Sequence, residues 1–171
     1  LTSNHFSYIL MLRTLDVFSG VARVLPLILG SIGMPNLIVK IKRNQKFEHD
    51  KTENGWELLR PGAPVPDDDF SLEFVPVLIG EEKEITGSEM FRRAILNKCS
   101  SQCMLDYLLK NSKVIPMELQ GKVLVFAATL WLDGGYLAVP CLYWSGGEWC
   151  PDFVFLDGGW HSNGVFVRLG A

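Results

Sequence analysis

The chain has 171 residues, of which 48% are apolar and 20% are charged, and its formal net charge is −3. These proportions are typical of a globular domain with a sizeable core, and they exclude a disordered chain. The negative net charge argues against a protein that coats nucleic acid through an overall basic field.

Four cysteines occur, at Cys99, Cys103, Cys141 and Cys150. This number is too small for a disulfide scaffold in a chain of this length, and no convincing secretory signal precedes them. We therefore expect reduced thiols and a cytoplasmic location.

Residues 1–33 contain no Lys and no Glu, whereas the following residues are rich in both, and Met34 lies at the change. We expect 1–33 to be an apolar leader that precedes a single domain at 34–171. A non-native upstream extension is the favoured interpretation of the leader. A helix packed on the domain is the second, and a membrane-associating or export segment at 17–32 is the third, although Arg23 and Pro26 interrupt that segment.

The region 37–79 is expected to contribute one to three strands. Residues 37–42 end in alternating apolar and basic residues, which predicts a strand with one solvent-facing side, and Trp56–Leu59 could pair with it. Three prolines between 61 and 66 exclude regular structure there. The run 70–79 predicts an edge strand or an extended arm, because Pro76 lacks a backbone donor.

A helix signal follows at Thr86-Gly-Ser-Glu89, which has the Thr-x-x-Glu form of a capping box. In such a box the Thr hydroxyl accepts the amide of Glu89, and the Glu89 carboxylate accepts the amide of Thr86. Apolar residues then recur at one-turn spacing on one side, and Pro116 follows the end. We expect a helix or a helical hairpin at about 88–111, with 98–101 either a break or a polar turn within one helix.

Three Gly-Gly pairs, at 134–135, 146–147 and 158–159, recur every twelve residues near the end of the chain. The apolar and aromatic runs around them predict four antiparallel strands at about 122–132, 136–144, 148–156 and 165–169. A two-residue loop at 146–147 would place Trp144 opposite Trp149 and Tyr143 opposite Cys150. The predicted fold is therefore α+β, with a four-stranded antiparallel meander (about 122–169) packed on the helix or helical hairpin (about 88–111).

One catalytic arrangement can be drawn, with Cys150 as nucleophile, His161 as base and Asp157 beside the histidine. Nothing in the spacing distinguishes it from a solvated histidine in a turn, so a small hydrolase-type enzyme is an alternative and not the main hypothesis. The chain has no phosphate-binding loop, no dinucleotide fingerprint and no His-Glu-x-x-His motif. We assign no catalytic residue and no cofactor.

The cysteines also suggest a metal site, because Cys99 and Cys103 would share one face of a helix. Cys141 and Cys150 could complete the ligand set, but the spacing matches no common zinc pattern, and we assign no metal. A disulfide between Cys141 and Cys150 would require a slipped register, since the expected pairing places them diagonally.

A weak nucleic-acid-binding protein is a further alternative, which the composition disfavours. Its basic residues would be Lys40, Lys42, Arg43, Lys46 and the pair Arg92-Arg93. Acidic residues at 48, 50 and 81–84 dilute this charge.

Five aromatic residues of the predicted meander offer a binding surface: Trp131, Tyr143, Trp144, Trp149 and Trp160. If exposed, they could hold a protein or a sugar, whereas the alternative is that they cover the core and fix strand register. The main functional hypothesis is a non-enzymatic binding or regulatory domain that contacts a protein partner through an aromatic face of the meander. Membrane contact is expected only if residues 17–32 are native and exposed, and the oligomeric state stays open.

A recurring pattern covers about half of the chain: Gly87-x-Glu89-Met90-x-x-Arg93-Ala94, Gln102, Leu108-Leu109, Ile115-Pro116, Leu124-Val125-Phe126-x-x-Thr129-x-Trp131, Val139-Pro140-x-Leu142-x-Trp144, Trp149 and Arg168-Leu169. This pattern resembles a group of small uncharacterised bacterial proteins. The chain departs from it at Ala127-Ala128, where the pattern has Pro-Gly. The resemblance implies a bacterial or phage-like cytoplasmic setting and Met34 as the native start. It implies no activity, cofactor or partner.

Overall fold

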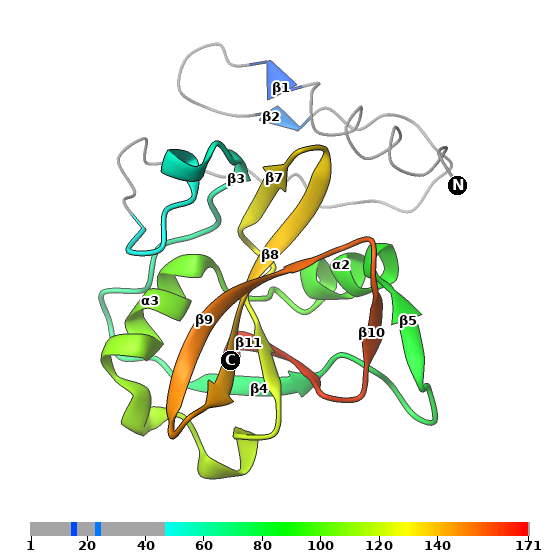
Figure 1. The fold of residues 1–171 in the computed structure, drawn as a ribbon. Coiled ribbons are helices and arrows are strands. Elements are labelled where there is room, and N and C mark those ends of the chain that lie inside the picture. The colour runs from blue at the N-terminus through cyan, green and yellow to red at the C-terminus, as the bar shows by residue number, and fades with distance from the viewer. Residues whose placement is uncertain (1–14, 17–22, 25–46, 171) are drawn as a thin grey trace. The chain divides into compact units, whose positions relative to one another are not determined.

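A computed structural model describes residues 15–16, 23–24 and 47–170. The chain divides into two units, Leu1–Asn44 and Gln45–Ala171. In the first unit, β1 (Leu15–Asp16) pairs antiparallel with β2 (Arg23–Val24). The rest of the predicted leader at 1–33 and the predicted strand at 37–42 lie outside the described residues. The following description concerns the second unit (Figure 1).

Seven strands form one curled, mostly antiparallel sheet, and two helices pack with it (Figure 1). The sheet has the order β3-β7-β8-β6-β11-β4, and β9 pairs with β8. Its strands are β3 (Glu57–Arg60), β4 (Leu72–Pro76), β6 (Val123–Val125), β7 (Leu130–Asp133), β8 (Tyr136–Ser145), β9 (Glu148–Phe155) and β11 (Gly164–Leu169). A separate antiparallel pair consists of β5 (Glu84–Thr86) and β10 (Gly159–His161). The predicted α+β class is confirmed.

The two helices of the described domain are α2 (Gly87–Leu96) and α3 (Gln102–Lys110). Residues 97–101 break the helix between them. The described part of the chain also contains three short 3₁₀ turns: η1 (Thr52–Asn54), η2 (Ser112–Val114) and η3 (Met117–Leu119).

Two of the three Gly-Gly pairs form the tight hairpin turns that the sequence predicts. The φ angles are 54° and 98° at Gly134 and Gly135, and 61° and 92° at Gly146 and Gly147. Two consecutive positive φ angles characterise the hairpin turn whose twist matches that of the flanking strands. The predicted register is confirmed, with Tyr143 opposite Cys150 and Trp144 opposite Trp149.

The meander differs from the prediction at its first and fourth strands. The expected strand 122–132 is split into β6 and β7. The five residues 126–130 lie opposite only two residues of β8, Val139 and Pro140, so this stretch cannot pair one to one with β8. Pro140 has no N–H, and its carbonyl accepts the amide of Phe126 at 3.0 Å, so regular pairing stops there. The fourth strand, β11, pairs parallel with β6 and antiparallel with β4 and does not pair with β9.

Strand β4 fulfils the prediction of an edge strand that contains Pro76, since β11 is its one partner among the described strands. The short segment before the prolines becomes β3, which pairs with β7. Residues 61–66 have no regular structure, as their prolines predict.

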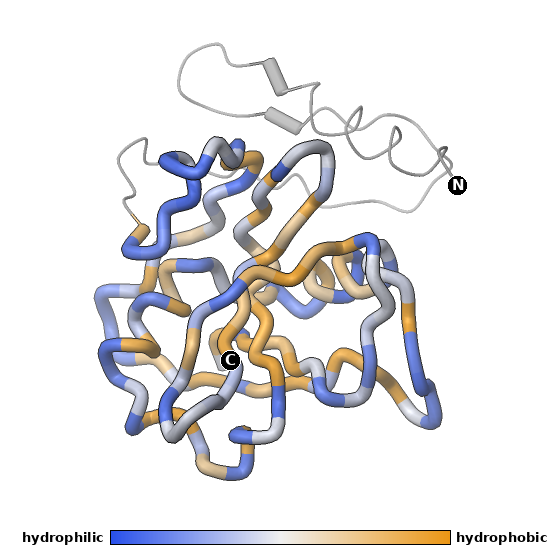
Figure 2. The backbone as a smooth tube through the Cα atoms, viewed as in Figure 1, coloured by the Kyte–Doolittle hydropathy of each residue, from blue (hydrophilic) through white to orange (hydrophobic). Residues whose placement is uncertain are grey.

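The hydrophobic core lies between the sheet and the helices, and one cluster in it joins α3 to the strands. This cluster contains Met104, Leu105 and Leu108 of α3 together with Leu124, Leu142, Trp149, Val165 and Val167 of the sheet. Figure 2 shows that hydrophobic stretches follow the central strands, whereas the loops are mostly hydrophilic. The apolar residues that repeat once per turn in α3 therefore face these strands.

The capping box of α2 is formed only in part. The Thr86 hydroxyl accepts the amide of Glu89 at 3.3 Å, as predicted. The Glu89 carboxylate does not return to Thr86 and instead accepts hydrogen bonds from Arg92 and Arg93.

At the other end of α2, Lys98 has a φ of 52°, a left-handed conformation that glycine adopts without strain. Replacing Lys98 with Gly is expected to raise the free energy of unfolding by about 0.5–1 kcal/mol, because the side chain no longer opposes this conformation. Urea unfolding of both proteins measures the difference. A glycine variant that is less stable than the original would contradict the assignment of strain to this residue.

Candidate binding face

The five aromatic residues singled out in the sequence do not lie together on one open surface. Trp131, Trp149 and Trp160 are buried, with 0%, 7% and 5% of their surfaces exposed. Tyr143 is 37% exposed, and Trp144 is half-buried against Trp149, with the two rings 5.6 Å apart and nearly perpendicular. The rings of Trp131, Trp149 and Trp160 thus cover or fill the core. This was the alternative to an exposed binding surface in the sequence analysis.

The strand register explains this distribution. Side chains alternate between the two sides of a strand, so Tyr143 lies on the opposite side of β8 from Trp144. Trp131 pairs with Ala138 and lies on the side of Trp144, while Trp160 belongs to β10 in the separate two-stranded sheet. The Trp131 indole donates a hydrogen bond of 2.8 Å to the side-chain oxygen of Gln102, which fixes the ring inside the core.

A second group of aromatic rings, which the sequence analysis did not single out, is partly open to solvent. It contains Trp56, Tyr136, Phe153 and Phe155, which we call the aromatic face. Ring centroids are 6.2 Å apart between Tyr136 and Phe155, 5.9 Å between Phe155 and Trp56, and 5.2 Å between Trp56 and Phe153. Tyr136 is 50% exposed and Phe155 is 37% exposed, whereas Trp56 and Phe153 are half-buried.

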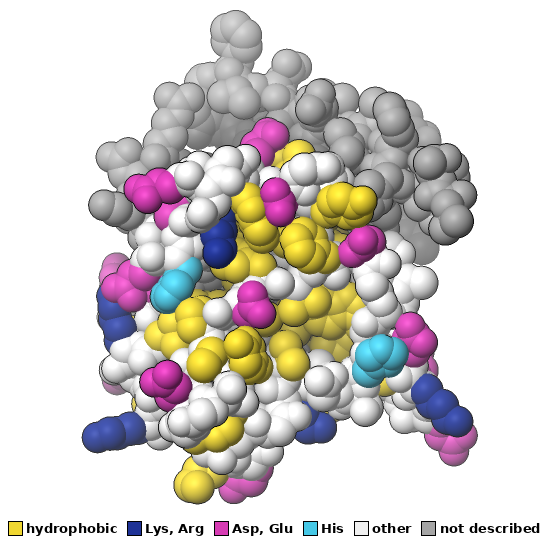
Figure 3. Space-filling model, viewed as in Figure 1, with side chains coloured by type: hydrophobic (Ala, Val, Ile, Leu, Met, Phe, Trp, Pro, Cys, Tyr) yellow, Lys and Arg dark blue, Asp and Glu magenta, His cyan; other side chains and the backbone are white. Residues whose placement is uncertain are grey.

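Strand geometry assembles the aromatic face. Phe153 and Phe155 are two residues apart in β9, so they share one side, and Phe155 lies opposite Ala138 of β8. Tyr136 is two residues before Ala138, and Trp56 immediately precedes β3. Figure 3 shows hydrophobic side chains gathered over the part of the molecule where β8 and β9 lie. The alternating Phe153-x-Phe155 pair was the sequence signal that could have identified this face.

A lysine lies over two rings of the aromatic face. The Lys51 Nζ is 5.0 Å from the centroid of Phe153 and 5.7 Å from that of Trp56. The loop that carries it is closed by the Lys51 carbonyl, which accepts the amides of Asn54 at 3.0 Å and Trp56 at 3.2 Å. Both distances to the rings lie within the range of cation–π interactions.

The edge of the sheet beside the aromatic face is poorly suited to pairing with another strand. In the described part of the chain, β9 pairs only with β8. The Pro140 carbonyl accepts the amide of Phe126, so the backbone groups of Pro140 point away from β9. In an antiparallel ladder the residue opposite then also points its N–H and C=O away from the pair, so the backbone groups of Phe153, and those of Pro151 two residues before it, point out from the edge of the sheet. Pro151 has no N–H, and the amide of Phe153 donates to Asp152 Oδ1 at 2.8 Å. Recognition at this edge would therefore depend on side chains.

The structure does not bring together the residues of the hydrolase alternative. The Cys150 Sγ lies near the carbonyls of Ser145 and Glu148 of its own hairpin, at 3.9 and 3.8 Å. The extended strand from Cys150 to Phe155 spans about 16 Å, and Asp157 follows beyond its end. Asp157 and His161 are both exposed, and no hydrogen bond or ion pair joins any two of these three side chains.

Cys99, Cys141 and Cys150 are free thiols, and Cys99 does not share a helix with Cys103. The Cys99 thiol donates to the Val125 carbonyl at 3.1 Å and accepts the Ala127 amide at 3.3 Å. Burial raises the pKa of Cys99 and that of Cys141 to about 12, so both thiols stay protonated at neutral pH. Among the described residues, no three His, Cys, Asp or Glu side chains converge in a way that could hold a metal ion.

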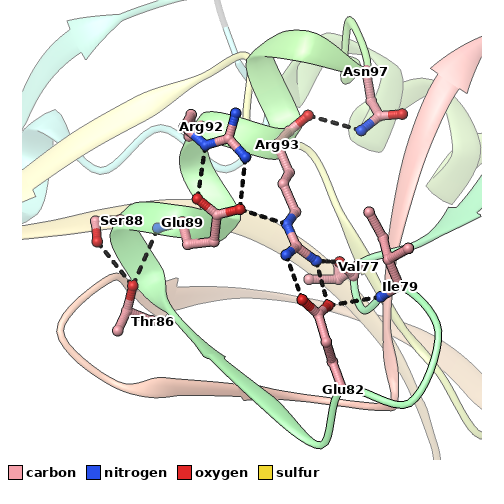
Figure 4. Close-up of polar contacts among 9 residues, drawn as sticks. All are labelled: Val77, Ile79, Glu82, Thr86, Ser88, Glu89, Arg92, Arg93 and Asn97. Atoms are coloured by element: carbon pink, nitrogen blue, oxygen red, sulfur yellow. Dashed lines mark hydrogen bonds and ion pairs between the residues drawn. The ribbon is translucent and has the colours of Figure 1, made fainter.

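The arginine pair has structural partners (Figure 4). The Arg93 guanidinium donates to both oxygens of Glu82 at 2.6 and 2.7 Å, to Glu89 at 2.8 Å and to the Val77 carbonyl at 3.0 Å. Arg92 donates two bonds of 2.7 Å to Glu89. Both charges of the expected basic pair are thus neutralised locally. The four other residues of that patch, Lys40, Lys42, Arg43 and Lys46, lie outside the described residues.

This ion-pair cluster predicts an acid-dependent stability. Hydrogen bonds from Arg93 lower the pKa of Glu82 to about 2, and those from Arg92 and Arg93 lower that of Glu89 to about 2, from an ordinary value of 4.5. Their contribution to folding is therefore present above pH 4.5 and is lost as the pH falls toward 2. We expect Arg93→Met to lower the thermal unfolding midpoint at neutral pH, with the difference from the original protein shrinking between pH 5 and pH 2.

Arg92→Met is the matched control, because Arg92 is exposed and, among the described residues, bonds only Glu89. It should produce a smaller shift. A difference between Arg93→Met and the original protein that stays constant across this pH range would contradict the role of the carboxylates.

Comparisons with protein-family models, with curated proteins and with solved structures find no match to this chain. Within the described residues, no helix combines the length and the apolar character needed to cross a bilayer. The function must therefore be inferred from the residues of the domain itself.

Proposed function

We propose that this chain is a non-enzymatic binding domain that contacts a protein partner through the aromatic face of the meander. The observation that carries the proposal is the pair of exposed rings, Tyr136 and Phe155, which contact each other. Phe155 also contacts the half-buried Trp56, which in turn contacts Phe153. Large aromatic anchors surrounded by other apolar groups supply most of the binding energy at many protein interfaces. Because these rings are braced by one another, they lose little conformational entropy when a partner binds.

The chemistry of the surroundings favours a protein segment with apolar and basic side chains as the occupant. Asp133 lies directly opposite Tyr136 in the β7–β8 ladder and therefore on the same side of the sheet. Asp157 follows β9 by two residues. These carboxylates complement a basic partner, which is also consistent with the net charge of −3. The proposal includes a reducing, cytoplasmic setting, which the free thiols of Cys99, Cys141 and Cys150 support.

Site-specific photo-crosslinking in cells that naturally produce the chain tests the proposal. A photoreactive phenylalanine analogue at position 155 is expected to give a discrete adduct with one protein. The same analogue at Met117, which is 76% exposed in η3, is the control and should not give that adduct. With the partner purified, Phe155→Ala should weaken binding about tenfold or more, while Met117→Ala leaves it unchanged.

Equal adducts from positions 155 and 117, or an affinity unaffected by Phe155→Ala, would contradict the proposal. An adduct with a second copy of the chain would replace it with self-association.

A further inference from the structure

We propose that the corner between the rings of Trp56 and Phe153 is a recognition site for an alkylammonium group of the partner, with Lys51 as its intramolecular occupant. This inference rests on the proposed function, since it specifies which side chain of the partner the aromatic face selects. The candidate ligand is a lysine side chain or its methylated form.

The geometry of the corner suits a cation. The Trp56 and Phe153 rings are 5.2 Å apart with an interplanar angle of 71°, so they form two walls that meet at a steep angle. Phe155 extends the wall beside Trp56 at 5.9 Å and 44°. Ring faces carry negative electrostatic potential, and tryptophan is the strongest aromatic partner for a cation. Cages of this type recognise quaternary and methylated ammonium groups.

The corner already holds an ammonium group, that of Lys51, at 5.0 and 5.7 Å from the two centroids. No described carboxylate forms an ion pair with Lys51, so the rings are the groups that hold its charge. A partner cation can therefore displace Lys51 without breaking a salt bridge. The Lys51 backbone would stay in place during this exchange, because its carbonyl closes the loop through Asn54 and Trp56.

This arrangement makes Lys51 a built-in competitor. A ligand can bind only while the Lys51 ammonium group is out of the corner. The apparent affinity of the ligand is therefore its intrinsic affinity multiplied by the fraction of time that the corner is free. A partner that brings both an ammonium group and an apolar anchor for Phe155 gains contacts that a free cation lacks. The competitor thus favours such a partner over small cations in solution.

Choline and its uncharged isostere 3,3-dimethyl-1-butanol provide a direct test on the full chain. Titrations are followed by the indole N–H resonance of Trp56, which the spectrum of Trp56→Phe assigns. Lys51→Ala empties the corner, and Lys51→Met keeps an apolar stem in it without the charge. We expect choline to bind Lys51→Ala about tenfold more tightly than it binds the original protein, and the neutral isostere to bind every variant weakly.

Lys51→Met should bind choline less tightly than Lys51→Ala, since its side chain still fills the corner. Equal binding of choline and the isostere by Lys51→Ala would overturn the inference, as would choline affinity that does not change when Lys51 is replaced. Either result leaves the protein-binding proposal in place, because the crosslinking at position 155 tests that separately. Circular dichroism confirms that each variant is folded before titration.

Discussion

Replacing Gly87 with Ala is expected to lower the free energy of unfolding by about 3 kcal/mol, even though alanine is the better helix former. Gly87 is the first residue of α2, and its α-carbon lies against the backbone of Leu156, just after β9. A Cβ at this position would be 1.9 Å from the Leu156 carbonyl oxygen and 2.6 Å from its carbon. These are backbone atoms, so the overlap can be relieved only by moving α2 away from the end of β9.

Gly121→Ala and Gly158→Ala are matched controls, because an added Cβ at either position meets nothing within 4 Å and neither residue has a positive φ. Both should change stability by less than about 1 kcal/mol. Urea unfolding followed by tryptophan fluorescence measures all three variants. A Gly87→Ala protein as stable as the two controls would show that the helix and strand do not approach as closely as described.

Replacing Gln102 with Leu is expected to lower the free energy of unfolding by about 2–4 kcal/mol, because it removes the partners of the buried Trp131 indole N–H and of the partly buried His49 carbonyl. The Gln102 side chain is fully buried; its oxygen accepts the Trp131 indole N–H at 2.8 Å and its nitrogen donates to the His49 carbonyl at 2.9 Å. This one side chain therefore joins α3, β7 and the segment before β3.

The double variant Gln102→Leu/Trp131→Phe distinguishes a lost hydrogen bond from a packing defect. If the orphaned indole N–H causes part of the loss, the two substitutions together cost about 1–2 kcal/mol less than their sum. Gln120→Leu is the control, since the Gln120 side chain makes no hydrogen bond in the described part of the chain. Strictly additive effects in the cycle would contradict the proposed coupling.

The same polar network shows why local sequence patterns could not predict how the segment 47–63 packs. The Thr129 hydroxyl accepts a hydrogen bond of 2.8 Å from the backbone N–H of Gln102 and donates one of 2.7 Å to the Pro61 carbonyl. Asp106 accepts the Glu48 amide and contacts His49 Nδ1, both at 3.1 Å. These partners lie 27 to 68 residues apart in the chain, and periodicity carries no information on contacts of that range.

The exposure of the aromatic residues was predicted less well than the fold. Tryptophans beside glycine turns were prominent in the sequence, but aromatic residues near turns serve the core and the interface equally well. Exposure depends on what covers each side of the sheet. At the β8–β9 hairpin end, Leu142 and Trp149 pack with α3, whereas Phe155 at the other end of β9 stays partly open.

The sequence by itself determined the local elements of this protein. Paired glycines require positive φ angles and so fix two hairpin turns and the register of Trp144 with Trp149, and a Thr hydroxyl marks the start of α2. Only the tertiary structure decided that β11 runs parallel to β6, that Trp131 and Trp160 are enclosed, and that Lys51 lies over Trp56 and Phe153. The physical reason is that turns and caps depend on neighbouring residues, whereas strand order and burial depend on which distant segments exclude water from each other.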